Sequence, residues 1–252
     1  MLLIWKIIFH ARPAWLALFL KKFLNPKPMI VEFMGSKMLL DPISALGQSI
    51  ISNKDYEHDM FALIAKYLKS EQVFIDVGAN EGIFTLFTSK IVGPRGRVIA
   101  FEPEPSIYNN LVLNIEINSL QNVETEKCAL GSTNGVQKFF TYSSLNRGAS
   151  SFIPISKRHY SACEVPVIRY ERWFKTRDLG FVNLVKVDIE GWEYQFLKGM
   201  GEFLNPSHIG VLIIELHPHQ LELLGDSVDQ ISDILDRAGY SLEHSHRRVV
   251  AK

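Results

Sequence analysis

The sequence predicts an α/β fold of the Rossmann-like kind, with a mostly parallel central sheet, helices on both faces, an antiparallel final strand and an N-terminal helical extension. Two short apolar runs, 73–77 and 97–102, each contain a carboxylate at or near their end, and a segment with helical periodicity separates them. Two further apolar runs, 182–188 and 211–215, follow later in the chain. Strands that alternate with helices in this way form a parallel sheet with right-handed crossovers.

The first half of the chain supplies most of these elements. A strand pair is predicted around Gly35-Ser36, within 30–40, and an amphipathic helix over 55–68. We then expect, in order, strand 73–77, helix 81–91 ended by Gly93-Pro94, strand 97–102, helix 106–118 with Ser106 as its N-cap, and strand 123–128. Asn134-Gly135 predicts a hairpin turn between 124–130 and 136–142, followed by a polar loop to Ser161.

The second half resumes the sheet. We expect a strand at 182–188, a helix from Glu190 and a strand at 211–215. Ser227 and Gln230 predict a capping box at the start of the last helix, and Gly239 predicts its end. Residues 240–252 are expected to form the antiparallel end of the sheet, whereas a full hairpin there is left open. The chain thus divides into 1–28, 29–70 (a strand pair and helix covering the cofactor pocket) and a main domain at 71–252.

Composition excludes several classes of protein. The chain is 47% hydrophobic and 21% charged, which is typical of one folded α/β core. Lysine plus arginine equals aspartate plus glutamate at 27 each, so no overall basic field favours a nucleic-acid partner. Cys128 and Cys163 match neither a disulfide framework nor a zinc motif. We therefore expect a reducing, cytoplasmic location.

The N-terminal segment departs from this even charge balance. Residues 1–28 carry five lysines and arginines, no acidic residue and many large apolar side chains. Such a segment can lie on an anionic membrane surface, so residues 1–24 predict peripheral contact with the inner face of the membrane. Charged residues and Pro13 interrupt the apolar run too early for the roughly 20 residues that span a bilayer. The alternative is a helix that packs on the domain or on a second subunit, which leaves the oligomeric state open.

A nucleotide-type cofactor is predicted at the end of the first apolar run. The turn at 78–82 has the sequence Gly-Ala-Asn-Glu-Gly, which lacks the G-x-G-x-x-G order of pyrophosphate-binding turns. Asp76 would repel a diphosphate but would attract the amino group and sulfonium region of S-adenosylmethionine. Glu102, at the end of the second run, can accept hydrogen bonds from both hydroxyls of a ribose. Capping of a strand or helix is the structural alternative for Asp76 and Glu102.

Five short motifs in order resemble the FkbM-type S-adenosylmethionine-dependent methyltransferases, over roughly residues 56–240. The motifs are Asp76-Val77-Gly78-Ala79-Asn80, Phe101-Glu102-Pro103, Ala129-Leu130-Gly131, Lys186-Val187-Asp188-Ile189-Glu190-Gly191 and Glu215-Leu216-His217. The resemblance implies a class I, Rossmann-like methyltransferase fold. It also implies that Asp76, Gly78, Asn80 and Gly82 surround the methionine part of the cofactor, Glu102 the ribose, and Cys128 with Ala129 the adenine. Residues 170–173, Tyr-Glu-Arg-Trp, depart from the Thr-Leu-Asp segment that is frequent in the family.

Carboxylates and an imidazole follow the last two parallel strands, where they would face the transferred methyl group. Methyl transfer requires an acceptor held in line and a group that removes its proton. We predict Asp188 or His217 as the base, with Glu215 orienting one of them or the acceptor. The alternative for Asp188 and Glu190 is to cap the following helix. No metal is assigned; a His217–His219 pair would need oxygen ligands guessed from Asp188 and Glu215.

Acceptor contacts are expected from the polar loop before Ser161. Its candidates are Arg147, Ser150, Ser151, Arg158 and His159, each of which can also be a solvated loop residue. Lys186, inside an apolar strand, is expected to snorkel or to pair with an acid. The resemblance implies O-methylation of a sugar, glycan or glycolipid acceptor. The alternatives are a small-molecule O- or N-methyltransferase, acting on a polyketide or amine, and a non-catalytic membrane-associated scaffold of the same fold.

Overall fold

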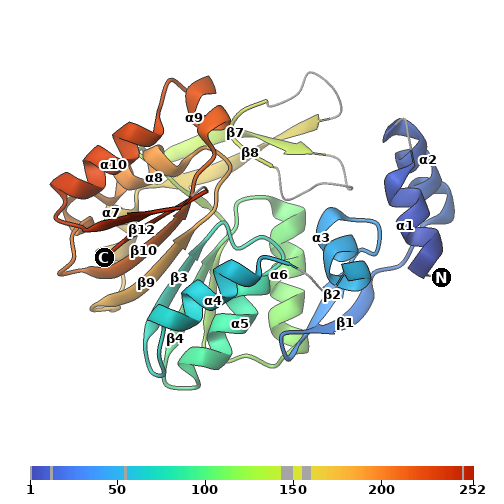
Figure 1. Cartoon of the computed structure of the whole chain (residues 1–252), viewed down its shortest axis with the longest axis horizontal. Coiled ribbons are helices and arrows are strands. Elements are labelled where there is room, and N and C mark those ends of the chain that lie inside the picture. Colours follow the sequence, from blue (N-terminus) through green and yellow to red (C-terminus); the bar gives the residue numbers. More distant parts are fainter. Residues whose placement is uncertain (1, 12–13, 54–55, 143–149, 155–159, 246) are drawn as a thin grey trace.

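The computed structural model describes residues 2–11, 14–53, 56–142, 150–154, 160–245 and 247–252. A central sheet is covered by helices on both faces, and two N-terminal helices lie at one end of the molecule (Figure 1). Arg147, Arg158 and His159, which the sequence proposed as acceptor contacts, lie outside the described residues.

The central sheet has the strand order β11-β12-β10-β9-β3-β4-β5. Its parallel strands are β3 (Val73–Val77), β4 (Arg97–Phe101), β5 (Val123–Glu126), β9 (Val182–Val187) and β10 (Ile209–Glu215). The last two strands, β11 (Leu242–His244) and β12 (Arg248–Ala251), form an antiparallel pair, and β12 also runs antiparallel to β10. The predicted fold class is confirmed, and the C-terminal hairpin that the sequence left open is formed.

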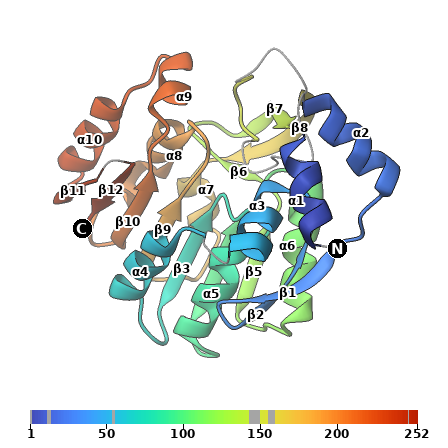
Figure 2. The same cartoon turned by 45° about the vertical axis from the view of Figure 1, so that its right-hand side comes forward.

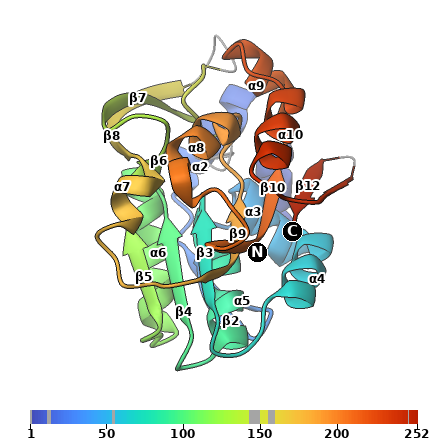
Figure 3. The same ribbon diagram turned by 90° about the vertical axis from the view of Figure 1, so that its left-hand side faces the viewer.

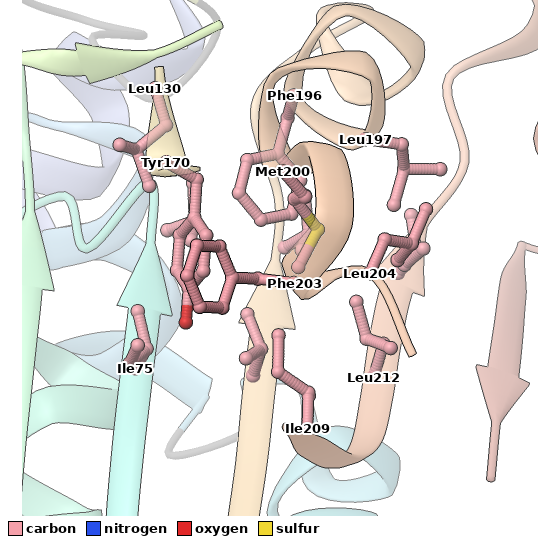
Figure 4. Packing of buried hydrophobic residues seen from close by; sticks show 14 of the residues in the cluster. Ile75, Leu130, Tyr170, Phe196, Leu197, Met200, Phe203, Leu204, Ile209 and Leu212 are labelled. Carbon is pink, nitrogen blue, oxygen red and sulfur yellow. The ribbon is translucent and has the colours of Figure 1, made fainter. Parts of the chain in front are cut away.

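Alternating side chains of the central strands fill two hydrophobic cores. Phe74 of β3 packs with α4 (His58–Tyr67), α5 (Ile83–Val92) and α6 (Pro105–Ile117) on one face of the sheet. Ile75 and Val77 belong to the other core, together with residues of α7 (Tyr170–Phe174), α8 (Glu193–Met200) and α10 (Val228–Arg237). Figure 3 shows these three helices from their side of the sheet. Tyr170 and Phe196 are wholly buried in this second core (Figure 4). Each large apolar side chain buried in this way contributes about 1.5–3 kcal/mol.

The front section of the chain forms a separate layer beside α6. Strands β1 (Met29–Phe33) and β2 (Ser36–Leu40) pair antiparallel, which confirms the predicted strand pair. β2 docks on α6, where Leu39 N donates to Asn114 Oδ1 at 2.6 Å. The short helices α3 (Ala45–Gln48) and η1 (Ser49–Asn53) then lead toward α4. This strand pair is thus anchored to the main domain.

Two helices precede this section: α1 (Leu2–His10) and α2 (Ala14–Leu24). α1 packs against α2, α3 and η1 (Figure 2), and Ile8 and Ala17 are buried. Other apolar side chains of the same two helices point to solvent; they are Ile7, Phe19, Phe23 and Leu24. In the part of the chain that the structure describes, no helix is long and apolar enough to cross a membrane.

The predicted hairpin around Asn134-Gly135 is wrong. Strand β7 (Gly135–Tyr142) pairs antiparallel with β8 (Tyr160–Ile168), and β8 also pairs in parallel with β6 (Ala129–Leu130). Within 124–130, β5 instead belongs to the central sheet and β6 to this second, three-stranded sheet. β7 and β8 pair over eight residues, from Gly135 opposite Val167 to Tyr142 opposite Tyr160. This long pairing outweighs the local turn preference. The loop predicted up to Ser161 accordingly ends in a strand that begins at Tyr160.

Helix starts differ from prediction at two places. Glu104, not Ser106, is the N-cap of α6, because Pro105 fits the first helical position and the Glu104 carboxylate accepts from Ser106 N and Ile107 N. α8 begins at Glu193 with no side-chain cap, so Asp188 and Glu190 do not cap it. The capping box of Ser227 and Gln230 is present at α10, as predicted. The remaining helices are α9 (Pro218–Leu223) and η3 (Gly201–Phe203).

The strand order reverses between β3 and β9. β3 is followed along the chain by its neighbour β4, whereas its other neighbour, β9, is reached only after the second sheet and α7. Ligands of open α/β sheets bind outside the carboxyl ends of the strands at such a switch point. The sequence places Gly78 directly after β3 and Asp188 directly after β9, so these two residues mark the expected site.

Candidate active site

A cavity opens at the carboxyl ends of β3, β4 and β9. Its wall combines backbone and carboxylates from the ends of these strands with apolar side chains from β6, β7 and the segment 150–152. The lining residues are Val77, Gly78, Asn80, Phe101, Glu102, Pro103, Ile107, Cys128, Ala129, Leu130, Phe139, Ser150, Phe152, Asp188, Ile189, Glu190 and Trp192. This set includes Gly78, Asn80, Glu102, Cys128, Ala129 and Asp188 from the predicted site residues.

The glycine turn after β3 brings the backbone of two strands together. Gly78 has φ +79°, and a Cβ at this position would lie 2.0 Å from the carbonyl oxygen of Asp188. Gly78 N and Ala79 N both donate to the carbonyl oxygen of Phe101, at 3.1 and 2.9 Å. Asn80 takes up φ +51°, a conformation that costs most residues energy and is tolerated by asparagine. Only glycine permits this approach at position 78.

Glu102 is held at the end of β4 by two backbone donors. Asn80 N donates to its Oε2 at 3.0 Å, and Glu104 N donates to its Oε1 at 2.8 Å. The side chain is buried, and burial raises its pKa to about 8 although the two N–H groups act in the opposite direction. Each oxygen keeps a lone pair that can accept from a hydroxyl group of a ligand. The position and donors suit a ribose diol.

An apolar slot lies beside Glu102. Cys128 and Ala129 line it together with Phe101 and Ile107, and both are buried. Burial raises the pKa of the Cys128 thiol to about 12, so the thiol stays neutral and unreactive at physiological pH. An apolar lining of this kind suits the adenine ring that the family resemblance assigns to it.

Asp76 and Gly82 lie behind the cavity wall. Asp76 is wholly buried; its Oδ2 accepts from Thr85 Oγ1 at 2.7 Å, and its Oδ1 lies 3.2 Å from Lys186 Nζ. Gly82 is the N-cap of α5, close to Leu111. The pairing of Lys186 with an acid, one of the two predicted outcomes, is confirmed. Asp76 thus supports the turn from below and does not reach the cavity.

The predicted catalytic group gathers around His217. This residue follows β10 and precedes α9, and its Nε2 lies 3.8 Å from Asp188 Oδ1 and 3.6 Å from Glu190 Oε2. Asp188 and Glu190 line the cavity. Glu190 has φ +51°, a strained backbone of the kind that clusters at functional sites. Within the described residues, Asp188, Glu190 and His217 also form a group whose donor atoms are close enough to hold a metal ion.

A third carboxylate, Glu193, orients the imidazole from behind. His217 Nδ1 and Glu193 Oε1 are 2.8 Å apart, and the Glu193 side chain is wholly buried. Burial alone would lower the pKa of His217, but the hydrogen bond to Glu193 and the charges of Glu193, Glu190 and Asp188 raise it to about 9. Burial is the largest of the causes that raise the pKa of Glu190, which reaches about 7. The only sign of Glu193 in the sequence is that it is a second acid three residues after Glu190.

Glu215 lies apart from this group, next to Arg248. The two side chains are 3.6 Å apart, and Arg248 also pairs with Glu57 of the front section. Burial raises the pKa of Glu215, and the charge of Asp188 adds to this effect. Glu215 is not among the cavity-lining residues, so its position suits an orienting role more than contact with the methyl group.

An aromatic wall, which the sequence did not reveal, closes the cavity on the side of the second sheet. Phe152 stacks on Trp192 with ring centroids 4.2 Å apart and meets Phe139 edge-on at 4.9 Å. The segment is fixed by an antiparallel bridge between Phe140 and Ser151. Ser151 is wholly buried and bonds to Ile153, whereas Ser150 lines the cavity. Of the predicted acceptor contacts that are described, only Ser150 therefore reaches the site.

The methyltransferase FkbM domain model matches residues 76–242, which include all the residues that line the cavity. The chain belongs to the FkbM methyltransferase family. The predicted family, its methyltransferase class and its cofactor, S-adenosylmethionine, are thereby confirmed.

Named relatives share parts of this chain. It is similar to Methyltransferase 1 of Beauveria bassiana, with 26% identity over 52% of the chain and 59% of that protein. Hexuronic acid methyltransferase AglP of Haloferax volcanii is 26% identical over 81% of the chain and 79% of its own length. Among solved structures, fibrillarin of Aeropyrum pernix, in complex with S-adenosyl-L-methionine, superposes with TM-score 0.44 and 12% identity over 76% of the chain and 72% of fibrillarin. The match to Methyltransferase 1 thus covers about three fifths of that relative's length.

Proposed function

We propose that the protein is an S-adenosylmethionine-dependent O-methyltransferase that methylates a hydroxyl group of a sugar, glycan or glycolipid. The observation that carries this proposal is that Glu102 and Asp188 line the same cavity. Glu102 can accept hydrogen bonds from the hydroxyls of a ribose, and Asp188 lies at the carboxyl end of β9. A sugar acceptor is supported by the similarity to AglP, which extends over most of both chains.

The cofactor would enter at the carboxyl ends of β3 and β4. Gly78 and Asn80 would face its methionine part with their backbone, Glu102 would accept from the ribose hydroxyls, and the slot at Cys128 and Ala129 would take the adenine. Asp76 would act from behind this surface through Lys186, whose Nζ donates to Gly78 O at 2.9 Å. Gly82 would act by starting α5.

Transfer would then need only an aligned acceptor and a proton acceptor. The cofactor would supply an electrophilic methyl group on a sulfonium that leaves as a neutral thioether, and the residues of the chain would hold the acceptor hydroxyl in line and take up its proton. Asp188 and His217 are the proposed base candidates, and Asp188 is the one that lines the cavity. Glu215 would orient this group from the side of Arg248.

The first test is calorimetric titration of the purified protein with S-adenosylhomocysteine, beside Glu102→Ala and a matched control, Glu116→Ala, on the exposed face of α6. We expect micromolar binding by the wild type and the control and a large loss in Glu102→Ala. Methyl transfer is then measured against a panel of sugars, lipid-linked sugars, polyketide hydroxyls and amines. Turnover only with polyketides or amines favours the small-molecule alternative, and absence of cofactor binding by folded protein favours the scaffold alternative.

Peripheral membrane contact through residues 1–24 is part of the same proposal. One side of the α1–α2 pair is buried: Ile8 and Ala17 are buried, and α1 contacts α2, α3 and η1. Packing on protein therefore explains the apolar residues of this side. The outer side exposes Ile7, Phe19, Phe23 and Leu24 next to the exposed Lys6 and Lys22. Apolar side chains flanked by basic ones favour the surface of an anionic membrane, where a lipid-linked acceptor would lie.

A further inference from the structure

His217 Nε2 faces the carboxylates of Asp188 and Glu190 across a gap that it does not bridge by a hydrogen bond; Glu190 Oε2 accepts from Gln220 Nε2 at 3.2 Å and keeps a second lone pair. The distances from His217 Nε2 to Glu190 Oε2 and Asp188 Oδ1, 3.6 and 3.8 Å, exceed those of N–H···O hydrogen bonds. One donor atom from each of these residues lies within 4.8 Å of the other two. Donor atoms that share one small cation at about 2.1 Å are separated from each other by about 3 to 4 Å. The gap therefore has the dimensions of an ion site.

The orientation of the imidazole is fixed by a group outside this gap. Glu193 is wholly buried, and its Oε1 accepts from Gly191 N at 2.9 Å and lies 2.8 Å from His217 Nδ1. Glu193 Oε2, on the same carboxylate, is buried without a hydrogen-bond partner. A histidine that binds a metal through one ring nitrogen almost always gives the other N–H to a carboxylate or carbonyl group. Glu193 thus leaves Nε2 directed at Asp188 and Glu190.

Charge in this corner is unbalanced among the described residues. Lys186 lies closer to Asp76, at 3.2 Å, than to Asp188, at 3.8 Å, and Arg248 pairs with Glu57 and Glu215. Asp188, Glu190 and Glu193 therefore have His217 as their principal remaining cation. The side chains of Asp188 and Glu190 are only 31% and 22% exposed. Partly buried carboxylates in excess are costly unless a cation accompanies them.

We propose that Asp188, Glu190 and His217 bind one divalent metal ion at the acceptor side of the cavity, with Glu193 as the positioning residue for His217. Two carboxylate oxygens and one imidazole suit Mg²⁺ or Mn²⁺ better than a soft, thiolate-seeking ion. The sequence assigned no metal, and the pair it considered, His217 with His219 near Glu215, is not the group that folding assembles. His219 is exposed, and Glu215 faces Arg248.

The ion would narrow the acceptor class of the proposed function, on which this inference rests. A hard cation with open positions binds two neighbouring oxygens, as in a vicinal diol or a hydroxy acid of a sugar. It would also offset the repulsion between an acidic sugar and the carboxylates of the site. The bound hydroxyl would lose its proton more readily, and Asp188, which lines the cavity, would take up this proton. In this arrangement His217 would be a ligand and Asp188 the base.

The test is titration of the EDTA-treated, dialysed protein with MnCl₂, followed by calorimetry and by electron paramagnetic resonance of free Mn²⁺. We expect one site in the wild type, loss of at least tenfold in affinity in Asp188→Asn, Glu190→Gln and His217→Ala, and a 10- to 100-fold loss in Glu193→Gln. His219→Ala is the matched control and should bind as the wild type does. Thermal unfolding of every variant, and its affinity for S-adenosylhomocysteine, show that the fold is retained.

Absence of Mn²⁺ binding by the wild type overturns the proposal, as does equal binding by wild type and folded His217→Ala. Retained affinity in Glu193→Gln removes the positioning role. The proposed function is judged separately, because S-adenosylhomocysteine is expected to bind at Glu102, which is not one of the proposed metal ligands. Methyl transfer by the metal-free protein would leave the function standing and end the role of the ion in the reaction. Failure of cofactor binding would end the function and the narrowing of its acceptor class, whereas metal binding is still decided by the Mn²⁺ titration.

Discussion

Lys186 and Asp76 form a buried ion pair that joins the two strands of the switch point. Lys186 Nζ lies 3.2 Å from Asp76 Oδ1, and the two side chains are 2% and 0% exposed. The same ammonium donates to Gly78 O at 2.9 Å and lies 3.8 Å from Asp188. One cation therefore connects the glycine turn after β3 with the carboxyl end of β9. The pair explains why a lysine occupies an otherwise apolar strand.

Removing the lysine should leave a buried carboxylate without its cation. We predict that Lys186→Met lowers the free energy of unfolding by about 3–5 kcal/mol. Removal of one partner of a buried ion pair leaves the other charge buried without compensation. Urea unfolding measures this change. The double variant Asp76→Asn with Lys186→Met should recover part of the loss. Lys198→Met, on the partly exposed side of α8, serves as control, and an equal effect there would contradict the role of the pair.

Gly78 should not tolerate a side chain. In Gly78→Ala the new Cβ would overlap the Asp188 carbonyl oxygen, 2.0 Å away, so β3 and β9 would have to separate at the cofactor turn. Gly225 is the matched control, since it has a similar φ of +77° and open space around its Cβ position. We expect Gly225→Ala to cost about 1–2 kcal/mol from backbone strain alone.

Denaturant unfolding and titration with S-adenosylhomocysteine compare the two glycine variants. Gly78→Ala should lose clearly more stability than Gly225→Ala, and cofactor binding with it. Equal losses in both variants would mean that the strand approach at Gly78 contributes nothing beyond its backbone conformation.

Glu102 should make the free protein less stable as pH rises. Burial raises its pKa from the ordinary value of 4.5 to about 8, so the folded state holds a proton that the unfolded chain releases between these values. Stability from this group is fully present below pH 4.5 and is lost as pH rises through about 8. Because a tenfold change in proton affinity corresponds to about 1.4 kcal/mol, the loss is on the order of a few kcal/mol.

The experiment compares wild type with Glu102→Gln in urea at pH 5 and pH 9. The glutamine variant keeps the shape but does not titrate, so its stability should decline less over this range than that of the wild type. Since other groups titrate in both proteins, the difference between the two declines is the quantity of interest. Parallel declines would contradict the raised pKa.

Local patterns were sufficient for the parallel strands and the Gly/Asn turn after β3. The run 73–77 became β3 with the same bounds, because a short apolar run between polar segments has few other ways to be buried. The Gly/Asn turn and Glu102 could be placed because their roles depend on neighbours that follow the same two strands. The capping box at Ser227 is likewise a contact over three residues.

Long-range pairing set the limit of sequence reasoning. The Asn134-Gly135 turn signal is local, but β7 found a better partner in β8, whose register the sequence does not specify. The sequence predicts a cofactor contact for Asp76 from its position near the end of an apolar run, whereas its partner Lys186 comes from a distant strand. Glu193 was missed because its importance arises from complete burial beside His217, which only the packing of the folded chain creates.

The exposed face of α2 should carry any membrane contact. Phe19 and Phe23 are 58% and 77% exposed and stack on each other with ring centroids 6.4 Å apart. We predict that Phe19→Ser with Phe23→Ser abolishes sedimentation with anionic liposomes and leaves thermal unfolding unchanged, because these side chains bury little area in the free protein. Phe181→Ser, which changes an exposed phenylalanine before β9, is the control.

This double variant is sharper than deletion of residues 1–24, which would also remove the buried Ile8 and Ala17. Deletion is expected to abolish liposome binding as well. Wild-type binding should weaken in high salt, because basic side chains next to the phenylalanines contribute through screened charges. Unchanged sedimentation of the double variant would remove the membrane proposal and leave domain packing as the role of these helices.

The strongest distinction between binding and catalysis is expected at Asp188 and His217. Neither residue is needed for the ribose contact at Glu102, so Asp188→Asn and His217→Ala should bind S-adenosylhomocysteine as the wild type does. Turnover should fall by about 10² to 10⁴, the range for loss of a positioned proton-transfer group. His219→Ala, two residues away and exposed, should keep full turnover. Because the cofactor affinity serves as an internal check of folding, wild-type turnover in either variant would remove that residue from the catalytic group, and wild-type turnover in both would place the chemistry elsewhere in the cavity.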